Sequence, residues 1–228
     1  MPYRYLSELM APSVRAAQEH YGSRDGMERL IAGYEAPSTL GPQEIEFIRA
    51  RDGFYLGTVG ESGWPYVQHR GGPPGFLHVL DDQGPGSVLG WADFRGNRQY
   101  VSVGHLGASP RVSLFLMDYA TRRRMKVLGT ARVLDARAGR EGAQLAERLA
   151  PRGYDARTER VVLVEMHSYD WNCPQHITPR WSRAELEPAL APLRAEIHRL
   201  REENAALRGT TTGGQPAAGA RPEGRRGR

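Results

Sequence analysis

Short apolar runs separated by turn residues occupy the middle of the chain, from residue 54 to residue 171. Such runs, several of which alternate apolar and polar positions, predict β-strands. The expected strands cover 54–59, 65–70, 76–81, 87–93, 110–119, 122–135 and 160–171. Because no long helical pattern separates them, we expect a mainly β, α+β fold with a six- to seven-stranded antiparallel barrel or sandwich.

The first two expected strands read as a hairpin. The turn between them is GESGW, in which we expect Gly60 and Gly63 to take positive φ angles. Between later strands the apolar spacing predicts only two helices, over 97–106 and 139–150. The helices of the β region are therefore expected to be short and peripheral.

Residues 1–50 carry a different pattern, with apolar residues at helical spacing. Pro42 stands where a helix can begin, because proline is favoured in the first turn. We expect these residues to form an N-terminal helical segment that packs on a barrel domain of residues 51–177.

Residues 178–208 repeat apolar positions at alternating spacings of four and three. The series is Leu186, Leu190, Leu193, Ile197, Leu200, Asn204 and Leu207. This heptad pattern, with asparagine at one a position, is typical of a parallel two-stranded coiled coil. A single amphipathic helix packed on its own domain is the alternative. Pro188 and Pro192 interrupt the start of the pattern, so we expect a continuous helix from about Ala191.

The formal net charge is +5, from 31 lysines and arginines against 26 acidic residues. Lys126 is the only lysine, and part of the excess lies in residues 209–228, which lack apolar periodicity and are expected to form a disordered tail. The charge therefore does not indicate a nucleic-acid partner. There is no apolar run of membrane-spanning length and no secretion signal, so we expect a cytoplasmic protein without a membrane partner.

The motifs of several common catalytic classes are missing. The sequence has no GxxxxGK[ST], GxGxxG, HExxH or GxSxG pattern. Cys173 is the only cysteine, and no two histidines lie at ligand-like spacing, so no metal site is predicted. The candidate that remains is GWADFRGNRQY, residues 90–100, which directly follows an expected strand.

The polar cluster in this stretch consists of Arg95, Asn97, Arg98 and Gln99. We expect these residues to begin a helix, whose free backbone N–H groups would bind a phosphate together with the arginines. Gly96 would let the backbone approach an anion closely, and Asp93 is expected to orient the cluster. The alternative is an ordinary polar surface turn.

The order of elements around the cluster resembles the pyridoxamine 5'-phosphate oxidase family, the FMN-binding split barrel. The resemblance covers roughly residues 42–177. ADFRGNRQY is similar to the family's T-N-x-x-S-R-K phosphate-binding segment, PRVSL follows it, and MKVLGTARVL is similar to the family's Q-V-R-V-x-G-x-A strand. The resemblance implies a homodimer of split β-barrels with FMN bound in the clefts between subunits.

The resemblance also implies roles for particular residues. Asn97 and Arg98 match positions that bind the FMN phosphate, with Arg95 as a helper and Gln99 beside them. Arg124 and Lys126 fall on the strand that reaches the flavin from the partner subunit. The remaining cofactor-binding positions implied are Gln68 and Arg70 on the second strand, and Trp171, Gln175 and His176 after the last strand.

The implied function is that of an FMN-dependent oxidoreductase, which exchanges hydride or electrons between NADH, NADPH or a small organic donor and an acceptor. Two departures argue against pyridoxamine 5'-phosphate as the substrate: ITPRWSRAELEP replaces the family's R-L-H-D/E-R segment, and GNR replaces S-R-K. The sequence identifies no catalytic acid or base. The alternatives are a non-catalytic flavin-binding or interaction protein, a deazaflavin-dependent reductase, and a haem protein with His105 or His176 as axial ligand.

Overall fold

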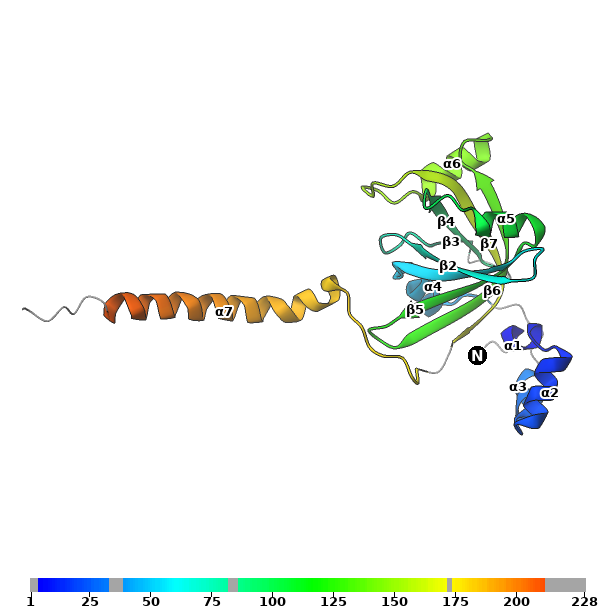
Figure 1. The fold of residues 1–228 in the computed structure, drawn as a ribbon, viewed down its shortest axis with the longest axis horizontal. Helices are drawn as coiled ribbons and strands as arrows, with labels where there is room; N and C mark the ends of the chain where they lie inside the picture. Colours follow the sequence, from blue (N-terminus) through cyan, green and yellow to red (C-terminus); the bar gives the residue numbers. More distant parts are fainter. Residues whose placement is uncertain (1–3, 33–38, 82–85, 172–173, 212–228) are drawn as a thin grey trace, which may run out of the picture. The chain divides into compact units, whose positions relative to one another are not determined.

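The computed structural model describes residues 4–32, 39–81, 86–171 and 174–211. The chain divides into two compact units, Met1–Pro179 and Arg180–Arg228. The first unit contains all the strands and the helices α1 to α6, and the second contains the helix α7 (Figure 1).

One curved, fully antiparallel sheet forms the centre of the first unit (Figure 1). Its strands are β1 (Gly53–Val59), β2 (Pro65–Gly71), β3 (His78–Asp81), β4 (Val88–Phe94), β5 (Arg111–Asp118), β6 (Arg123–Asp135) and β7 (Thr158–Trp171). The strand order is β2-β1-β5-β6-β7-β4-β3, so β2 and β3 are the edges and the barrel is split between them rather than closed. The predicted mainly β, α+β split-barrel fold is confirmed.

The helices of the first unit are short. They are α1 (Arg4–Glu8), α2 (Pro12–His20), α3 (Arg24–Ile31), α4 (Pro42–Arg49), α5 (Val101–Ala108) and α6 (Arg140–Leu149). Pro42 opens α4, and the Glu44 carboxylate accepts the N–H of the N-cap residue Gly41 at 3.1 Å, which is the half of a capping box that glycine allows. Among the described residues, no helix combines the length and the apolar character needed to cross a membrane.

The core lies on the concave face of the sheet, as the alternation in each strand predicts. In β1, Phe54 and Leu56 are buried while Tyr55 and Val59 are exposed. The same inward face carries buried side chains from β5, β6 and β7, and α4 closes it with Phe47 and Ile48. The inward residues of these three strands include Leu114, Leu116, Met125, Val127, Val162, Val164 and Met166.

The β1–β2 hairpin differs in one detail from the prediction. Gly63 has a φ of +76°, as expected, but Gly60 does not take a positive φ. Glycine is required at position 60 because a Cβ there would lie 2.4 Å from Cδ2 of His105. His105 is fixed in this place by α5 and by a 3.1 Å hydrogen bond between its Nδ1 and the hydroxyl of Thr58.

Helix α7 runs from Arg183 to Thr211. The prediction that the two prolines delay the helix until about Ala191 is wrong, because Pro188 and Pro192 both lie inside it. Both are exposed, so water can satisfy the carbonyl groups that lose their N–H partners. The helix also continues past residue 208, where the disordered tail was expected to begin, and residues 212–228 lie outside the described residues.

Candidate functional site

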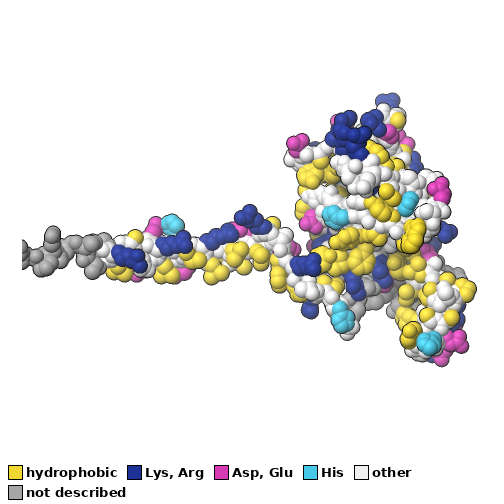
Figure 2. Space-filling model, viewed as in Figure 1, with side chains coloured by type: hydrophobic (Ala, Val, Ile, Leu, Met, Phe, Trp, Pro, Cys, Tyr) yellow, Lys and Arg dark blue, Asp and Glu magenta, His cyan; other side chains and the backbone are white. Residues whose placement is uncertain are grey.

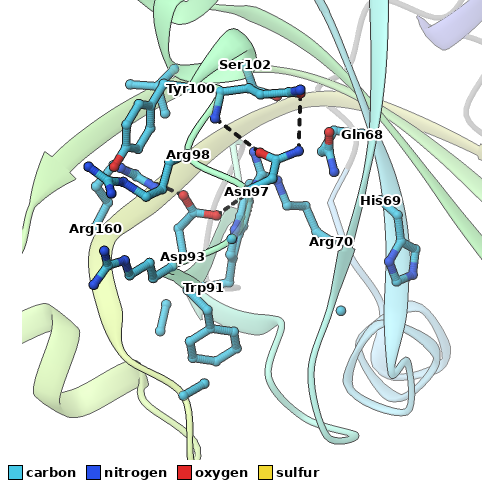
Figure 3. Close-up of a pocket in the computed structure, with 18 of the residues that line it drawn as sticks. Gln68, His69, Arg70, Trp91, Asp93, Asn97, Arg98, Tyr100, Ser102 and Arg160 are labelled. Carbon is cyan, nitrogen blue, oxygen red and sulfur yellow. Dashed lines mark hydrogen bonds and ion pairs between the residues drawn. The ribbon is translucent and has the colours of Figure 1, made fainter.

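A cavity of about 510 Å³ opens between β2, β4, the segment 95–100 and the start of α5 (Figure 3). This volume is in the range of small-molecule sites. Its polar lining includes four arginines and a single carboxylate: Arg70, Arg95, Arg98, Arg160 and Asp93. The excess of positive charge favours an anionic ligand.

The Asp93 carboxylate organises the floor of this cavity. It is 2% exposed and accepts hydrogen bonds from Nη1 of Arg70 at 2.8 Å and Nε of Arg160 at 3.0 Å. Arg160 is the direct cross-strand partner of Asp93 in the β4–β7 ladder, whereas Arg70 reaches it from β2. The single carboxylate of Asp93 therefore holds two guanidinium groups in place.

Arg160 is held on its other side as well. Its guanidinium carbon lies 5.0 Å from the centre of the Tyr100 ring, a cation–π distance. Its Nη1 lies 3.2 Å from the Glu159 carboxylate, which also accepts a 3.3 Å hydrogen bond from the Tyr100 hydroxyl. These contacts fix the segment before α5 against β7.

Segment 95–100 is a loop and not the first turn of a helix. The Asn97 side-chain oxygen accepts the Gln99 N–H at 3.1 Å, an Asx turn that competes with helix formation. Arg98 and Tyr100 have φ angles of +64° and +54°, and α5 begins only at Val101. The prediction that the polar cluster begins a helix is therefore wrong by several residues.

The loop presents its cations to solvent at the mouth of the cavity. Arg98 is exposed, and Arg95, whose side chain is 43% exposed, lies 3.8 Å from the Glu159 carboxylate. A Cβ at Gly96 would meet no atom within 4 Å, so the packing of the chain does not require glycine there. Asp93 does not contact Arg95, Asn97 or Arg98 in the hydrogen bonds of the site, which corrects the role expected for it.

Three buried donors of the cavity lining have no hydrogen-bond partner among the described residues. They are Nε of Arg70, Nε1 of Trp91 and the hydroxyl of Ser102. Ser102 lies in the first turn of α5, where backbone N–H groups also lack helical partners. Since buried donors without partners are costly, this donor set fits a ligand with several acceptor oxygens.

The structure brings six of the predicted site residues together at this cavity. They are Gln68, Arg70, Arg95, Asn97, Arg98 and Gln99. Gln68 and Arg70 point inward because they lie opposite Leu56 and Phe54 of β1, on the core face. Gln68 also accepts a hydrogen bond from the Tyr66 hydroxyl.

The other five predicted residues do not line this cavity. Arg124 and Lys126 lie on the opposite face of the sheet, since they alternate with the buried Met125 and Val127. Nζ of Lys126 forms a 2.8 Å ion pair with Asp170.

The three residues near the end of the first unit likewise lie outside the cavity lining: Trp171, Gln175 and His176. The Trp171 ring packs edge-on against Phe47 at 4.6 Å, and its Nε1 donates to Glu44 at 2.9 Å, so within one chain the residue holds α4 on the sheet. Gln175 and His176 are exposed, and the intervening residues 172–173 lie outside the described residues.

Sequence reasoning missed several residues of the site. In the sequence Arg160 is only the first residue of an expected strand, and its charge pair with Asp93 becomes recognisable once β4 is paired with β7. Tyr100 and Ser102 carry no distinctive sequence signal, because a hydroxyl near a helix start is an ordinary feature of sequences. Trp91 packs in the core, since it is 1% exposed and its ring centre lies 5.0 Å from that of Phe54, but the residue also lines the cavity, and its Nε1 has no hydrogen-bond partner among the described residues.

A family model described as pyridoxamine 5'-phosphate oxidase matches residues 40–169, more than half of the chain. This span includes all seven strands up to Tyr169 and the whole of the cavity lining. No curated protein matches the sequence.

Several solved structures resemble this chain in fold. HupZ of Group A Streptococcus shares 13% identity with a TM-score of 0.46, covering 62% of this chain and 100% of its own. An FMN-binding protein from Syntrophomonas wolfei shares 10% identity with a TM-score of 0.41, covering 71% and 97%. A protein from Clostridium acetobutylicum, related to general stress protein 26, shares 17% identity with a TM-score of 0.39, covering 60% and 88%. Likeness at this level carries no argument about ligand or activity.

Proposed function

Because this chain belongs to the pyridoxamine 5'-phosphate oxidase family, we propose that it is an FMN-binding oxidoreductase. Its reaction would exchange hydride or electrons between NADH, NADPH or a small organic donor and an acceptor. The observation that carries the proposal is the cavity between β2 and β4, whose lining holds four arginines and one carboxylate, and where three buried donors lack hydrogen-bond partners among the described residues.

The phosphate of FMN is the part of the cofactor that this lining fits best. Arg95 and Arg98 stand at the mouth of the cavity, and arginine binds phosphate through two parallel hydrogen bonds. The Asn97 amide and the Ser102 hydroxyl add uncharged hydrogen-bonding groups. Asp93 would keep Arg70 and Arg160 oriented as the phosphate binds, so that little reorganisation is needed.

Bound FMN would supply the redox chemistry. The residues of the chain would hold the cofactor, limit the access of water and leave space for a donor. None of them is proposed as a proton donor or acceptor.

We also propose that two copies form a homodimer across the convex face of the sheet. Tyr55, Val59 and Val67 expose 38%, 44% and 64% of their surface on neighbouring positions of β1 and β2, and exposed apolar patches mark interfaces. Arg124 and Lys126 lie on the same convex face, so a second copy could bring these cations to the flavin.

In this dimer, Val67→Asp should lower FMN affinity at least about tenfold, while Val67→Thr should not. Equal FMN affinities of the two variants would refute this arrangement.

The experiment that tests the oxidoreductase function is anaerobic reduction of the FMN-loaded protein. Addition of NADH or NADPH should bleach the flavin absorbance, and an added acceptor should restore it. If neither nicotinamide nor a panel of small organic donors reduces bound FMN, the protein is a flavin-binding module and not an enzyme of this kind. Parallel titrations with FMN and the deazaflavin decide between the two cofactors by their relative affinities.

A further inference from the structure

One side of α7 exposes a stripe of large apolar side chains. Figure 2 shows hydrophobic side chains along one side of the helix and charged ones along the other. Leu186, Leu193, Ile197, Leu200 and Leu207 are between 39% and 62% exposed. Within Arg180–Arg208, only Leu190 is partly buried, so the rest of the unit does not cover this stripe.

We propose that α7 joins two copies of this chain as a parallel two-stranded coiled coil. The stripe places apolar residues at every d position and at all but one of the a positions of three heptads, and such a stripe is narrower than the apolar face of a helix that packs on a globular core. The d positions are all leucine, and leucine at d favours a coiled coil of two helices. The proposal concerns the second unit alone and does not depend on FMN binding.

Asn204 occupies an a position in the last heptad. Its amide nitrogen donates to the Leu200 carbonyl at 3.3 Å, and this hydrogen bond does not use the side-chain oxygen. An asparagine at a that meets its own equivalent fixes the register and favours parallel dimers. In a register shifted by one heptad, the Asn204 of one copy would instead face Ile197 of the other copy and be left buried without its amide partner.

The charges beside the stripe match a second copy of the same helix. With Leu186 at d, the g positions carry Glu196 and Glu203, and the e positions that follow them by five residues carry Arg201 and Arg208. In a parallel coiled coil, a g residue lies next to the e residue five positions later on the other chain. Glu196 would thus meet Arg201 of the second copy, and Glu203 would meet Arg208, on both sides of the dimer.

An antiparallel pair would reverse this match. Antiparallel helices bring g next to g and e next to e, so the glutamates would face glutamates and the arginines would face arginines. Glu196 and Glu203 already contact Arg199 within the helix, at 2.8 Å and 3.2 Å, but such exposed pairs contribute little. A carboxylate can accept from two arginines, so these contacts are compatible with the pairs between helices.

Disulfide trapping in the full-length chain tests the parallel register. In a Cys173→Ser background, Leu193→Cys and Leu200→Cys are made separately at two d positions one heptad apart. Ala195→Cys, at an exposed f position, is the control. In the parallel coil both d-position cysteines meet their own equivalents, so mild oxidation should give covalent dimers about tenfold faster than the control.

The alternatives give different outcomes. An antiparallel coil would let at most one of the two d positions meet its own equivalent, so trapping at only one would overturn the proposal. Trapping at neither above the control rate would also overturn it, and would mean that the stripe is covered by another partner or by the chain's own first unit. The trapping rates with and without added FMN should agree. The test therefore remains valid even if the protein binds no flavin.

A charge exchange tests the e–g pairs. In the Leu200→Cys chain, Glu196→Arg and Arg201→Glu should each slow trapping, because each places like charges together on both sides of the dimer. The double variant restores opposite charges between the helices but not the contact of Glu196 with Arg199, so it should recover trapping. If the double variant is as slow as the single ones, the proposed pairing is wrong.

Discussion

Arg70 on β2 donates to the Asp93 carboxylate on β4 at 2.8 Å, although the two strands lie far apart in the strand order of the sheet. The ion pair therefore ties together the two sides of the split barrel at the point where the cavity opens. Since Asp93 is 2% exposed and Arg160 also binds it, the pair both stabilises the fold and positions two of the four arginines.

Replacing Asp93 should destabilise the protein strongly. Asp93→Asn would leave the partly buried Arg70 without its carboxylate partner and Arg160 with Glu159 alone, so we expect the free energy of unfolding to fall by about 3 kcal/mol. Urea denaturation followed by circular dichroism measures this change. The control is Asp135→Asn, which removes an exposed pair with Arg137 and should change stability little; similar losses in both variants would show that Asp93 has no special role.

Removing the exposed cation at the mouth of the cavity should weaken FMN binding and leave the fold intact. We expect Arg98→Ala to lower FMN affinity about 10- to 100-fold, the loss of one or two charge-assisted hydrogen bonds. Fluorescence quenching of FMN measures the dissociation constant. Arg111→Ala, an exposed arginine on β5 outside the cavity, is the matched control; unchanged affinity for Arg98→Ala would place the phosphate elsewhere.

Gly96 offers a test that separates binding from folding. Its position is open, so Gly96→Ala should leave the unfolding midpoint unchanged or slightly higher. If the backbone at this position approaches a bound phosphate, the added methyl group should nevertheless weaken FMN binding several-fold. Wild-type affinity in this variant would mean that the loop backbone does not approach the ligand.

The stability of the first unit should fall in acid. Burial raises the pKa of Asp118, but hydrogen bonds from Thr121 and the charge of Arg51 outweigh it, and the pKa is lowered from 3.8. A carboxyl whose pKa is lowered by folding stabilises the protein above its unfolded pKa, and this contribution disappears as the pH falls through the folded pKa. We therefore expect the unfolding free energy to drop below about pH 4, and Asp118→Asn should show a smaller drop; identical pH profiles would contradict this.

The strands could be predicted from the sequence because burial on one face imposes a period of two, which is visible in runs such as RVSLFLMD. The same local pattern could not show that β4 pairs with β7, and so it could not bring Arg160 next to Asp93. It also could not show that the Asn97 side chain delays α5. These features depend on long-range pairing and on side-chain competition for backbone groups.

The prolines of α7 show a case in which a local sequence rule predicts an interruption that the helix does not have. Proline disfavours a helix interior by a local rule, but both prolines of α7 are exposed, so water can replace the lost hydrogen-bond partner. The heptad positions remained readable through both prolines, because the spacing of the leucines does not depend on where the helix begins.

The most direct test of the account is the absorbance spectrum of the purified full-length protein, combined with the mass of any molecule released on denaturation. The account predicts a yellow protein with a flavin spectrum that releases FMN, or a protein that acquires this spectrum when FMN is added at micromolar concentration. A colourless protein that binds no FMN under these conditions would contradict it.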